Sequence, residues 1–330
     1  MKRFNLTIIA LSLIFPFCSC NINRNGNSAT TKAEFTRLDN IVANFSSYNS
    51  KEQIAIIDSL SIPLNDYIYL MGASTGDISA SIDSLSHTTA FAMFKPEVDK
   101  VFTSTEILEN DLGIINTNIQ EKLPSLPDYV FYGIISPYRQ QVMLVDSTIY
   151  IALNHYLGAN HEAYRSMPEF TRATKQSAYI PVDVAESIVS VEYPFVADDT
   201  PTAIQYLLYE GAKVKAISIL TAIDDIPTLM GWNAEQASTV ELQEAAIWRK
   251  MAEDNIIYST DMSIARRLCE PAPNSRAISP DLPGRVGRYI GYRIVSSYLE
   301  NNPSTTLLNI LSPDFYNNPS TLINSSYTPE

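Results

Sequence analysis

The hydrophobic pattern of this 330-residue chain changes its period twice, and this change restricts the fold more than any other feature of the sequence. Between Phe35 and about Leu123 the apolar residues recur at spacings of three and four, which is typical of amphipathic helices. Two segments rich in Val, Ile and Tyr follow, at 129–136 and 140–153, and predict strands. Helical spacing resumes after Pro168. Because no internal repeat or linker separates these parts, the sequence predicts an α+β fold: a predominantly helical single domain with a small central β-sheet.

The first twenty residues, MKRFNLTIIALSLIFPFCSC, have the three parts of an export signal. Lys2 and Arg3 supply the positive charge, and the apolar run at 6–17 is too short to span a bilayer. Ser19 before Cys20 fits the small-residue-then-cysteine pattern of a bacterial lipobox. Ordinary cleavage and a retained apolar anchor are the alternatives to lipidation.

A lipidated Cys20 would divide the chain into three parts. These are a signal peptide at 1–19, a flexible tether at 20–33 that is rich in Asn, Ser and Thr, and one domain at 34–330. The covalent diacylglycerol lipid on Cys20 would hold the protein on a membrane, and it is the only cofactor that we expect. The residues just after Cys20 contain no acidic cluster, which favours an outer-membrane protein whose domain faces the periplasm over one on the cell surface.

Charge and cysteine content argue against several classes of protein. The formal net charge of −13 argues against a nucleic-acid partner, because binding to phosphates needs a basic surface. After removal of the signal and lipidation of Cys20, Cys269 would be the only free thiol, and the apolar core would have to stabilise the fold without disulfides. We expect Cys269 to be a buried helix residue, since a free cysteine behaves as a small hydrophobic side chain.

The sequence contains no standard catalytic or metal-binding motif. HExxH, GxSxG, Walker and GxGxxG patterns are all missing from it. The three histidines, His87, His155 and His161, are too few and too badly spaced for a zinc site. We expect each of them to be solvated or hydrogen-bonded, and we predict neither a metal ion nor an enzyme of a standard class.

Glu210 is the residue that most needs an explanation. A helix over about 202–220 would place it on the apolar stripe that includes Ala203 and Val214. It could be a metal ligand, a catalytic carboxylate or a structural anchor. We favour the anchor, with an arginine as its partner, because an unpaired buried carboxylate costs several kcal/mol. The neighbouring Gly211 lowers helix propensity by about 1 kcal/mol and therefore predicts the close approach of another backbone.

The segment LPGRVGRYIG, at 282–291, has glycines whose spacing differs from that of nucleotide-binding loops. We expect these glycines to form a turn and to let a helix over 286–299 pack closely against a neighbour: Gly284, Gly287, Gly291. The arginines of the same region can pair with acidic side chains: Arg285, Arg288, Arg293.

Several groups of residues together carry a resemblance to a known family. They are Tyr156-Leu157-Gly158, Tyr209-Glu210-Gly211, Glu244 with Trp248, and Pro283-Gly284-Arg285 followed by Gly287, Gly291 and Tyr292. From roughly residue 90 onward the chain resembles the gliding-motility lipoprotein GldB family. Three positions depart from the family pattern, because Gln243, Leu282 and Thr328 stand where Asn, Ser and Lys are usual. The resemblance implies a membrane-anchored lipoprotein, in a family associated with the gliding and secretion apparatus, with no established enzymatic activity.

The resemblance also implies a distant similarity to zinc peptidases of the HExxH type, which take a third ligand from a downstream Glu-Gly helix. In that alignment AESIV lies where HExxH would be, with Ala185 and Val189 in place of both histidines. Glu186 and Glu210 remain, and two carboxylates without imidazoles make a poor zinc site of this type. We therefore expect at most a degenerate zincin-like scaffold, with Glu186 as a solvated residue of a helix at 181–193.

Three functions are compatible with these observations. The first, which the missing ligands favour, is a non-catalytic lipoprotein of the bacterial cell envelope that binds an envelope protein partner. The second is a hydrolase, either of degenerate zincin type or using carboxylates such as Glu186 and Glu210 as general acid and base. The third is a glycan-binding surface lipoprotein, suggested by 19 tyrosines and 2 tryptophans. For that third function the signal is weak, because an aromatic at helical spacing such as Trp248 is more often a core residue.

Overall fold

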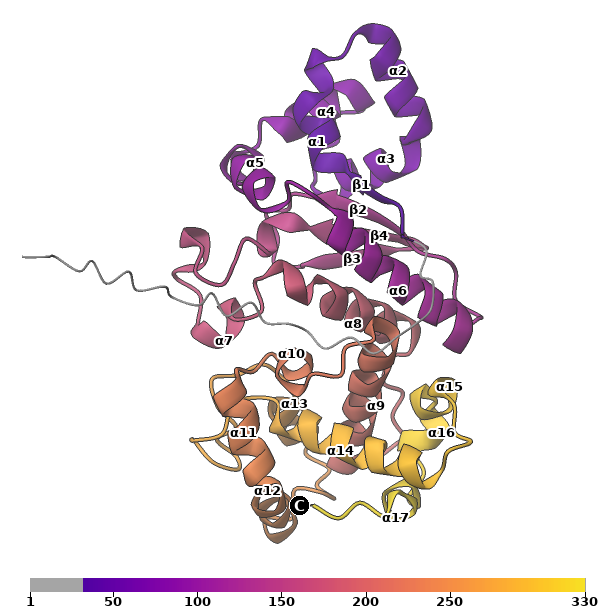
Figure 1. The fold of residues 1–330 in the computed structure, drawn as a ribbon, viewed down its shortest axis with the longest axis vertical. Helices are drawn as coiled ribbons and strands as arrows, with labels where there is room; N and C mark the ends of the chain where they lie inside the picture. Colours follow the sequence, from indigo (N-terminus) through magenta and orange to yellow (C-terminus); the bar gives the residue numbers. More distant parts are fainter. Residues whose placement is uncertain (1–31, 330) are drawn as a thin grey trace, which may run out of the picture.

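The computed structural model describes residues 32–329 of the chain. Figure 1 shows an elongated molecule with short helices at the N-terminal end, a small sheet in the middle and a second group of helices at the C-terminal end. One hydrophobic core includes buried residues from all three parts. The predicted α+β fold, mostly helical with a small central sheet, is confirmed.

The predicted signal peptide, Cys20 and the tether up to residue 31 lie outside the described residues. Lys32 and Ala33, the last two residues of the predicted tether, both contact helix α6 (Glu106–Lys122). The Ala33 amide donates a hydrogen bond of 3.0 Å to the Glu109 carbonyl oxygen, and Lys32 pairs with Glu106 at 2.8 Å. The chain is therefore held against the domain from residue 32 onward.

Five helices form the N-terminal end, coloured indigo and violet in Figure 1. Side chains that accept hydrogen bonds from backbone amides begin three of them: Asn49 caps α2, Asp77 caps α4 and Thr88 caps α5. A short 3-10 turn, η1 (Phe45–Ser47), separates the first two helices. The bounds are α1 (Leu38–Asn44), α2 (Ser50–Ser59), α3 (Ser61–Leu70), α4 (Ile78–Ser86) and α5 (Thr89–Val101).

Four strands form the sheet, in the order β1-β2-β4-β3. Strands β1, β2 and β4 are parallel, whereas β3 and β4 form an antiparallel hairpin. Gly133 of β2 has no room for a side chain, because a Cβ there would lie 2.8 Å from the side chains of both Phe35 and Leu153. The bounds are β1 (Phe35–Arg37), β2 (Val130–Ile134), β3 (Val142–Val145) and β4 (Thr148–Ala152).

The strand β1 corrects the expectation that helical structure begins at Phe35. Its three residues pair in register with β2, Phe35 opposite Phe131 and Arg37 opposite Gly133. Three residues are too few for the alternation of a strand to be visible in the sequence, and the partner strand lies almost a hundred residues away. Long-range pairing therefore decides the conformation of this segment.

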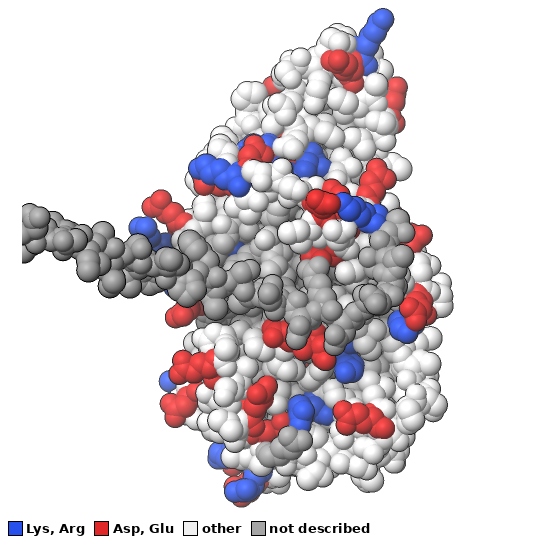
Figure 2. All heavy atoms as spheres, in the orientation of Figure 1, with Lys and Arg blue, Asp and Glu red and all other residues white. Residues whose placement is uncertain are grey.

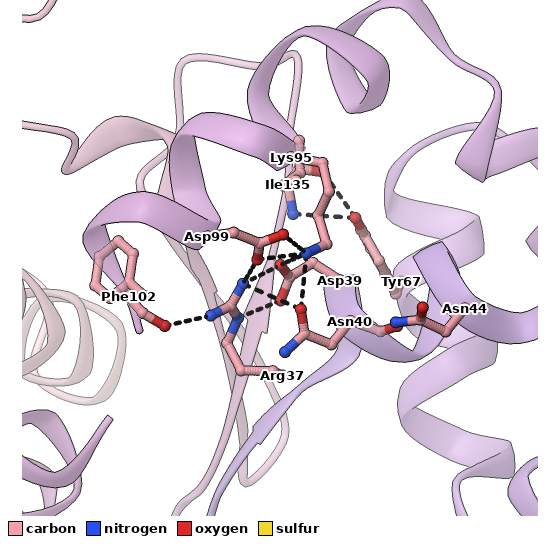
Figure 3. Close-up of polar contacts among 9 residues, drawn as sticks. All are labelled: Arg37, Asp39, Asn40, Asn44, Tyr67, Lys95, Asp99, Phe102 and Ile135. Carbon is pink, nitrogen blue, oxygen red and sulfur yellow. Dashed lines mark hydrogen bonds and ion pairs between the residues drawn. The ribbon is translucent and has the colours of Figure 1, made fainter. Parts of the chain in front are cut away.

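A network of charged side chains joins β1 to the N-terminal helices (Figure 3). Asp39 is fully buried and forms an ion pair with Arg37, while Lys95 of α5 lies 3.7 Å from the same carboxylate. Asp99 pairs with both cations, 3.0 Å from Arg37. Because a buried carboxylate is costly unless it is paired, this network fixes α5 against the junction of β1 and α1.

The segments between the sheet and the C-terminal helices come next. Helix α8 contacts β3 and β4 and also packs against α6 and α9. Pro181 lies in the first turn of α8, where a proline is well tolerated because its missing N–H would have no partner there. The bounds are η2 (Leu153–His155), η3 (Glu162–Tyr164), α7 (Glu169–Arg172), η4 (Ser177–Tyr179) and α8 (Ile180–Glu192).

The C-terminal group of helices is built around α9 (Ala203–Thr221), which is buried on nearly every side. A capping box of Thr202 and Gln205 begins it. Helix α14 (Val286–Asn301) crosses it, as Figure 1 shows. The remaining helices are α10 (Ile226–Met230), α11 (Ala234–Leu242), α12 (Glu244–Glu253), α13 (Met262–Cys269), α15 (Leu307–Leu311), α16 (Pro313–Tyr316) and α17 (Thr321–Ser325). Cys269 is buried at the end of α13, as expected.

The crossing of α9 and α14 confirms the close approach that Gly211 predicted. A Cβ on Gly211 would lie 2.1 Å from the carbonyl carbon of Gly291, and one on Gly291 would lie 1.9 Å from the carbonyl oxygen of Leu207. Gly287, one turn before Gly291, packs in the same way against Leu268 of α13. At both of these positions in α14, the lack of a side chain allows the neighbouring helix to approach closely.

Candidate functional site

A cavity of about 340 Å³ is lined by residues of α7, α8 and α10. Its walls also include the segments at 228–236 and 271–285. Three of its residues can carry charge: Asp183, Glu186 and Arg285. The volume is within the range of small-ligand pockets, and we take this cavity as the candidate site.

Asp183, in the first turn of α8, accepts two hydrogen bonds on one carboxylate oxygen. The Tyr156 hydroxyl donates one at 2.8 Å, and the Gln141 side-chain amide donates the other. Burial raises the pKa of Asp183 to about 7 and outweighs the hydrogen bond from Tyr156, which lowers it; the charge of Glu186 adds to the rise, and Arg285 and Lys175 oppose it. Near neutral pH this carboxyl can therefore either hold or release a proton.

A line of polar side chains leads from Gln141 away from the cavity. Lys175 donates a hydrogen bond of 2.6 Å to the Gln141 side-chain oxygen, and its Nζ lies 3.1 Å from Nδ1 of His155. His155 uses its other nitrogen, Nε2, to donate to the Tyr138 carbonyl oxygen at 2.8 Å, so its Nδ1 is the acceptor. Burial lowers the pKa of Lys175 to about 8, while burial and the charge of Lys175 lower that of His155 to about 4.

Glu186 and Glu210 share two cations directly behind the cavity. Lys213 lies 2.8 Å from Glu210 and 3.6 Å from Glu186, and Arg288 lies 2.8 Å from Glu186 and 3.8 Å from Glu210. Glu210 is buried, whereas the Glu186 side chain is 27% exposed and lines the cavity. Burial raises the pKa of Glu186, but Arg288 and Lys213 outweigh it and hold that pKa well below its usual range.

This charged quartet of Glu186, Glu210, Lys213 and Arg288 corrects one expectation and refines another. Glu186 is not a solvated helix residue, because it is paired with Arg288 from a helix about a hundred residues later. Glu210 has a fixed partner, as expected, but its nearest cation is Lys213, one turn along the same helix, and the expected arginine is more distant.

The backbone around Arg285 is shaped to hold its guanidinium at the cavity wall. Arg285 has a left-handed conformation (φ 72°), which is rare for residues other than glycine. Its Nη1 donates a hydrogen bond of 2.9 Å to the Met230 carbonyl oxygen and would be 3.0 Å from a Cβ on Gly231. Gly284 in turn has no room for a Cβ, because the Ala272 amide nitrogen would lie 2.5 Å from it, and its carbonyl accepts a bond from the Trp232 indole.

Glu244 lies outside the cavity and holds a C-terminal segment in place. Its carboxylate accepts hydrogen bonds from the hydroxyls of Tyr289, at 2.7 Å, and Tyr327, at 2.8 Å, and pairs with Arg293 at 3.0 Å. Trp248 contacts the Tyr327 ring edge to face, with 5.4 Å between the ring centroids. Trp248 is partly buried against the core, so its role is packing.

The family comparison covers all of these residues. The model of the family described as gliding motility protein GldB matches residues 19–329, a range that includes every described residue. The chain belongs to the GldB family. It is therefore a gliding-motility-related lipoprotein of the cell envelope. No curated protein and no solved structure matched the chain in the other two comparisons.

The candidate residues of the sequence divide between the cavity and its support. Glu186, Gly284 and Arg285 line the cavity. Glu210, Gly211 and Gly287 lie on the helices behind it, and Glu244 and Trp248 hold the segment around Tyr327. Asp183, Gln141 and Lys175 did not stand out in the sequence. Only Asp183 carried a signal, since it lies three residues before Glu186 and so on the same side of α8.

The histidines of this GldB-family protein do not converge. His155 is buried behind the cavity, His87 is exposed and bonded to the Asp83 carbonyl oxygen, and His161 lies 3.4 Å from Glu97. Between residues 32 and 329, no three His, Cys, Asp or Glu side chains are grouped so that they could hold a metal ion. None of the helices in this range is long and apolar enough to cross a membrane.

Proposed function

We propose that this GldB-family protein is a non-catalytic lipoprotein that binds a protein partner of the envelope through the cavity beside Arg285. The observation that carries the proposal is the charged quartet. Glu186 and Glu210 are the two carboxylates that the suggested similarity to zinc peptidases retains. Each of them has a cation of the same chain at 2.8 Å. A general base needs a pKa near the working pH, and that of Glu186 is far below it.

The cavity also suits a binding role because it combines apolar and polar walls. Trp232, Phe170 and Val182 supply apolar surface, while Gln236 and Arg285 supply polar groups. Binding sites are typically apolar with a few polar groups that fix orientation. Figure 2 shows acidic side chains interspersed with fewer basic ones on the face drawn, without a continuous basic patch, which favours a protein partner over a nucleic acid.

Site-specific crosslinking tests the partner. A photo-crosslinking residue at Gln236, in the cavity wall, is expected to capture a discrete envelope protein in cells that carry the native lipid anchor. The same residue at Tyr258, which is 69% exposed and lies away from this cavity, is the matched control. Equal crosslinking at both positions, or none at Gln236, would contradict the proposal.

The proposal includes processing at Cys20 after a signal peptide at 1–19, and an outer-membrane location with the domain in the periplasm. The lipobox and the lack of an acidic cluster just after Cys20 support it. Metabolic labelling with palmitate is expected to label the protein and to fail for Cys20→Ser. Protease added to intact cells is expected to leave the domain uncut, and cutting would place it on the cell surface instead.

A second function has one specific observation in its favour. Asp183 and Glu186 line the same cavity, and their surroundings move their pKa values apart, which is the pattern of a general acid beside an ionised carboxylate. A carboxylate-based hydrolase would therefore use Asp183 in place of the buried Glu210. Screening peptide and glycan libraries tests it: turnover that Asp183→Asn abolishes without unfolding would establish the hydrolase and remove the non-catalytic proposal.

A further inference from the structure

We propose that Arg285 makes this cavity a carboxylate-binding site, in which a peptide carboxylate pairs with the guanidinium while apolar side chains of the same peptide contact Trp232 and Phe170. The inference rests on the proposed function, because it specifies the chemistry by which the protein partner is recognised. The carboxylate can be that of a peptide C-terminus or of an acidic side chain, and the experiment below separates these two sources.

The first argument is the unequal pairing of two neighbouring arginines. Arg288 has Glu186 and Glu210 within ion-pair distance. Arg285, three residues earlier, has no carboxylate within 4.0 Å among residues 32–329, and its only hydrogen-bond acceptor there is the Met230 carbonyl oxygen. A guanidinium has five N–H donors, and the Nε of Arg285 is buried without any partner. Arg288 also has two buried nitrogens without a hydrogen-bond partner, but Glu186 and Glu210 neutralise its charge, whereas Arg285 lines the cavity without an ion pair among residues 32–329 and is left for a ligand.

The second argument is that the fold sustains an unfavourable backbone to keep Arg285 in this position. A left-handed conformation is energetically costly for a residue with a side chain, and such positions occur often at functional sites. A Cβ on Gly231 would lie 3.0 Å from the Arg285 guanidinium, and a Cβ on Gly284 would collide with the Ala272 backbone. A surface arginine that only increased solubility would need none of these features.

The third argument distinguishes a carboxylate from a phosphate. Asp183 and Glu186 line the same cavity as Arg285, so an anion bound there also faces acidic groups. A phosphate with nearly two negative charges would be repelled more strongly than a carboxylate with one. The threonines in the walls, Thr171, Thr174 and Thr228, and the amide of Gln236 are neutral donors that suit the second oxygen of a carboxylate.

The test uses tripeptides with the sequence Ala-Ala-Phe, in free-acid and C-terminally amidated forms, and an amidated Ala-Asp-Phe. Binding is measured by calorimetry on the whole domain and by the fluorescence of Trp232 in a Trp248→Phe background. We expect the free acid to bind at least tenfold more tightly than its amide. Tighter binding of amidated Ala-Asp-Phe than of amidated Ala-Ala-Phe would identify an acidic side chain as the source, and inorganic phosphate is not expected to compete.

Variants of the arginine complete the test. Arg285→Gln is expected to lower free-acid affinity at least tenfold, and Arg285→Lys to retain part of it, since lysine keeps the charge but loses the planar fork. Lys250→Gln, at a surface ion pair with Asp254, is the control and should bind as the wild type does. If Arg285→Gln does not fold, the comparison of the three peptides on the wild-type protein decides alone.

Two outcomes would overturn the inference: equal affinity for all three peptides, or no binding of any of them at millimolar concentration. Its failure is distinguishable from that of the proposed function. A partner that still crosslinks to Gln236 in a folded Arg285→Gln variant would keep the binding role and remove the carboxylate. Loss of the crosslink in that variant, together with weaker peptide binding, supports both.

Discussion

The backbones of α9 and α14 touch at Gly211 and Gly291, where a Cβ on the first glycine would lie 2.1 Å from the carbonyl carbon of the second. Backbone atoms at such a contact cannot move aside as a flexible side chain can. We therefore expect Gly211→Ala and Gly291→Ala each to lower the free energy of unfolding by about 3 kcal/mol. Chemical denaturation monitored by circular dichroism measures this loss.

A graded comparison supplies the control for the glycines. At Gly287 an added Cβ would lie 2.8 Å from the Leu268 Cβ and 3.2 Å from the Leu268 backbone, so the overlap is smaller than at Gly211. Gly287→Ala should therefore cost less, about 1–2 kcal/mol. Equal losses at Gly287 and Gly211 would show that the backbone contact is not the cause.

The charged quartet predicts strong coupling between Glu210 and Lys213. Glu210→Ala alone leaves a buried excess of positive charge and is expected to cost about 2–4 kcal/mol of stability. In the cycle of Glu210→Gln, Lys213→Met and the double variant, the double variant restores charge balance, so we expect a coupling energy of about 1–3 kcal/mol. Urea denaturation of the four proteins measures it.

An exposed pair in the same protein is the matched control for that cycle. Lys250 and Asp254 also lie one helical turn apart, at 2.7 Å, but both side chains are well exposed. Their coupling energy should be within about 0.5 kcal/mol of zero, because water screens such pairs. A similarly small value for Glu210 and Lys213 would mean that the quartet is solvated in solution.

The contact between Glu244 and Tyr327 predicts a graded effect on stability. Glu244→Ala removes the acceptor of two tyrosine hydroxyls and is expected to cost about 3 kcal/mol. Tyr327→Phe keeps the ring against Trp248 and removes one bond to a charged group, for a loss of about 1–2 kcal/mol. Thermal denaturation compares them with Tyr258→Phe, an exposed tyrosine whose substitution should have no effect.

Two buried groups predict opposite effects of pH on stability between pH 4 and 7. The pKa of Asp183 is raised from its ordinary value of 3.8 to about 7, so its contribution is fully present below 3.8 and is lost as the pH rises through 7. The pKa of His155 is lowered from 6.5 to about 4, so its contribution is present above 6.5 and is lost as the pH falls through 4. The two contributions oppose each other in the wild type.

Single variants separate these contributions. Relative to the wild type, Asp183→Asn should become more stable with rising pH, and His155→Gln with falling pH, each by at most about 1.4 kcal/mol per pH unit in this window. The other groups near Asp183 do not titrate there: Lys175 stays charged below pH 7, Tyr156 stays protonated, and Glu186 and Arg285 stay ionised. Urea denaturation at four pH values measures the slopes, and parallel curves for all three proteins would contradict the prediction.

Local features of the sequence were enough to predict two buried helices and the burial of Glu210 on one of them. The predicted helices at 202–220 and 181–193 agree with Ala203–Thr221 and Ile180–Glu192, because their apolar periodicity is strong. Lys213 could also have been found as the partner of Glu210, since residues three apart on a helix are neighbours. The cost of burying the carboxylate predicts a cation beside it but does not distinguish a lysine from an arginine.

The cavity could not be predicted because its residues come together only through the fold. Gln141 lies just before β3, Tyr156 follows the 3-10 turn η2, and Asp183 lies in the first turn of α8. No spacing in the sequence relates these three residues. The Pro-Gly-Arg motif was visible, but the left-handed conformation of Arg285 was not, because that region is normally taken by glycine. Tertiary contacts decide both features.

The bond between Tyr327 and Glu244 also has a consequence in time. The two residues are 83 positions apart, so at about 5–20 residues per second roughly 4–17 seconds of translation separate them. Throughout that interval the Glu244 carboxylate lacks one of its donors, and the helices around it cannot reach their final packing. A ribosome-bound chain would therefore remain open to chaperones well after its sheet has been synthesised.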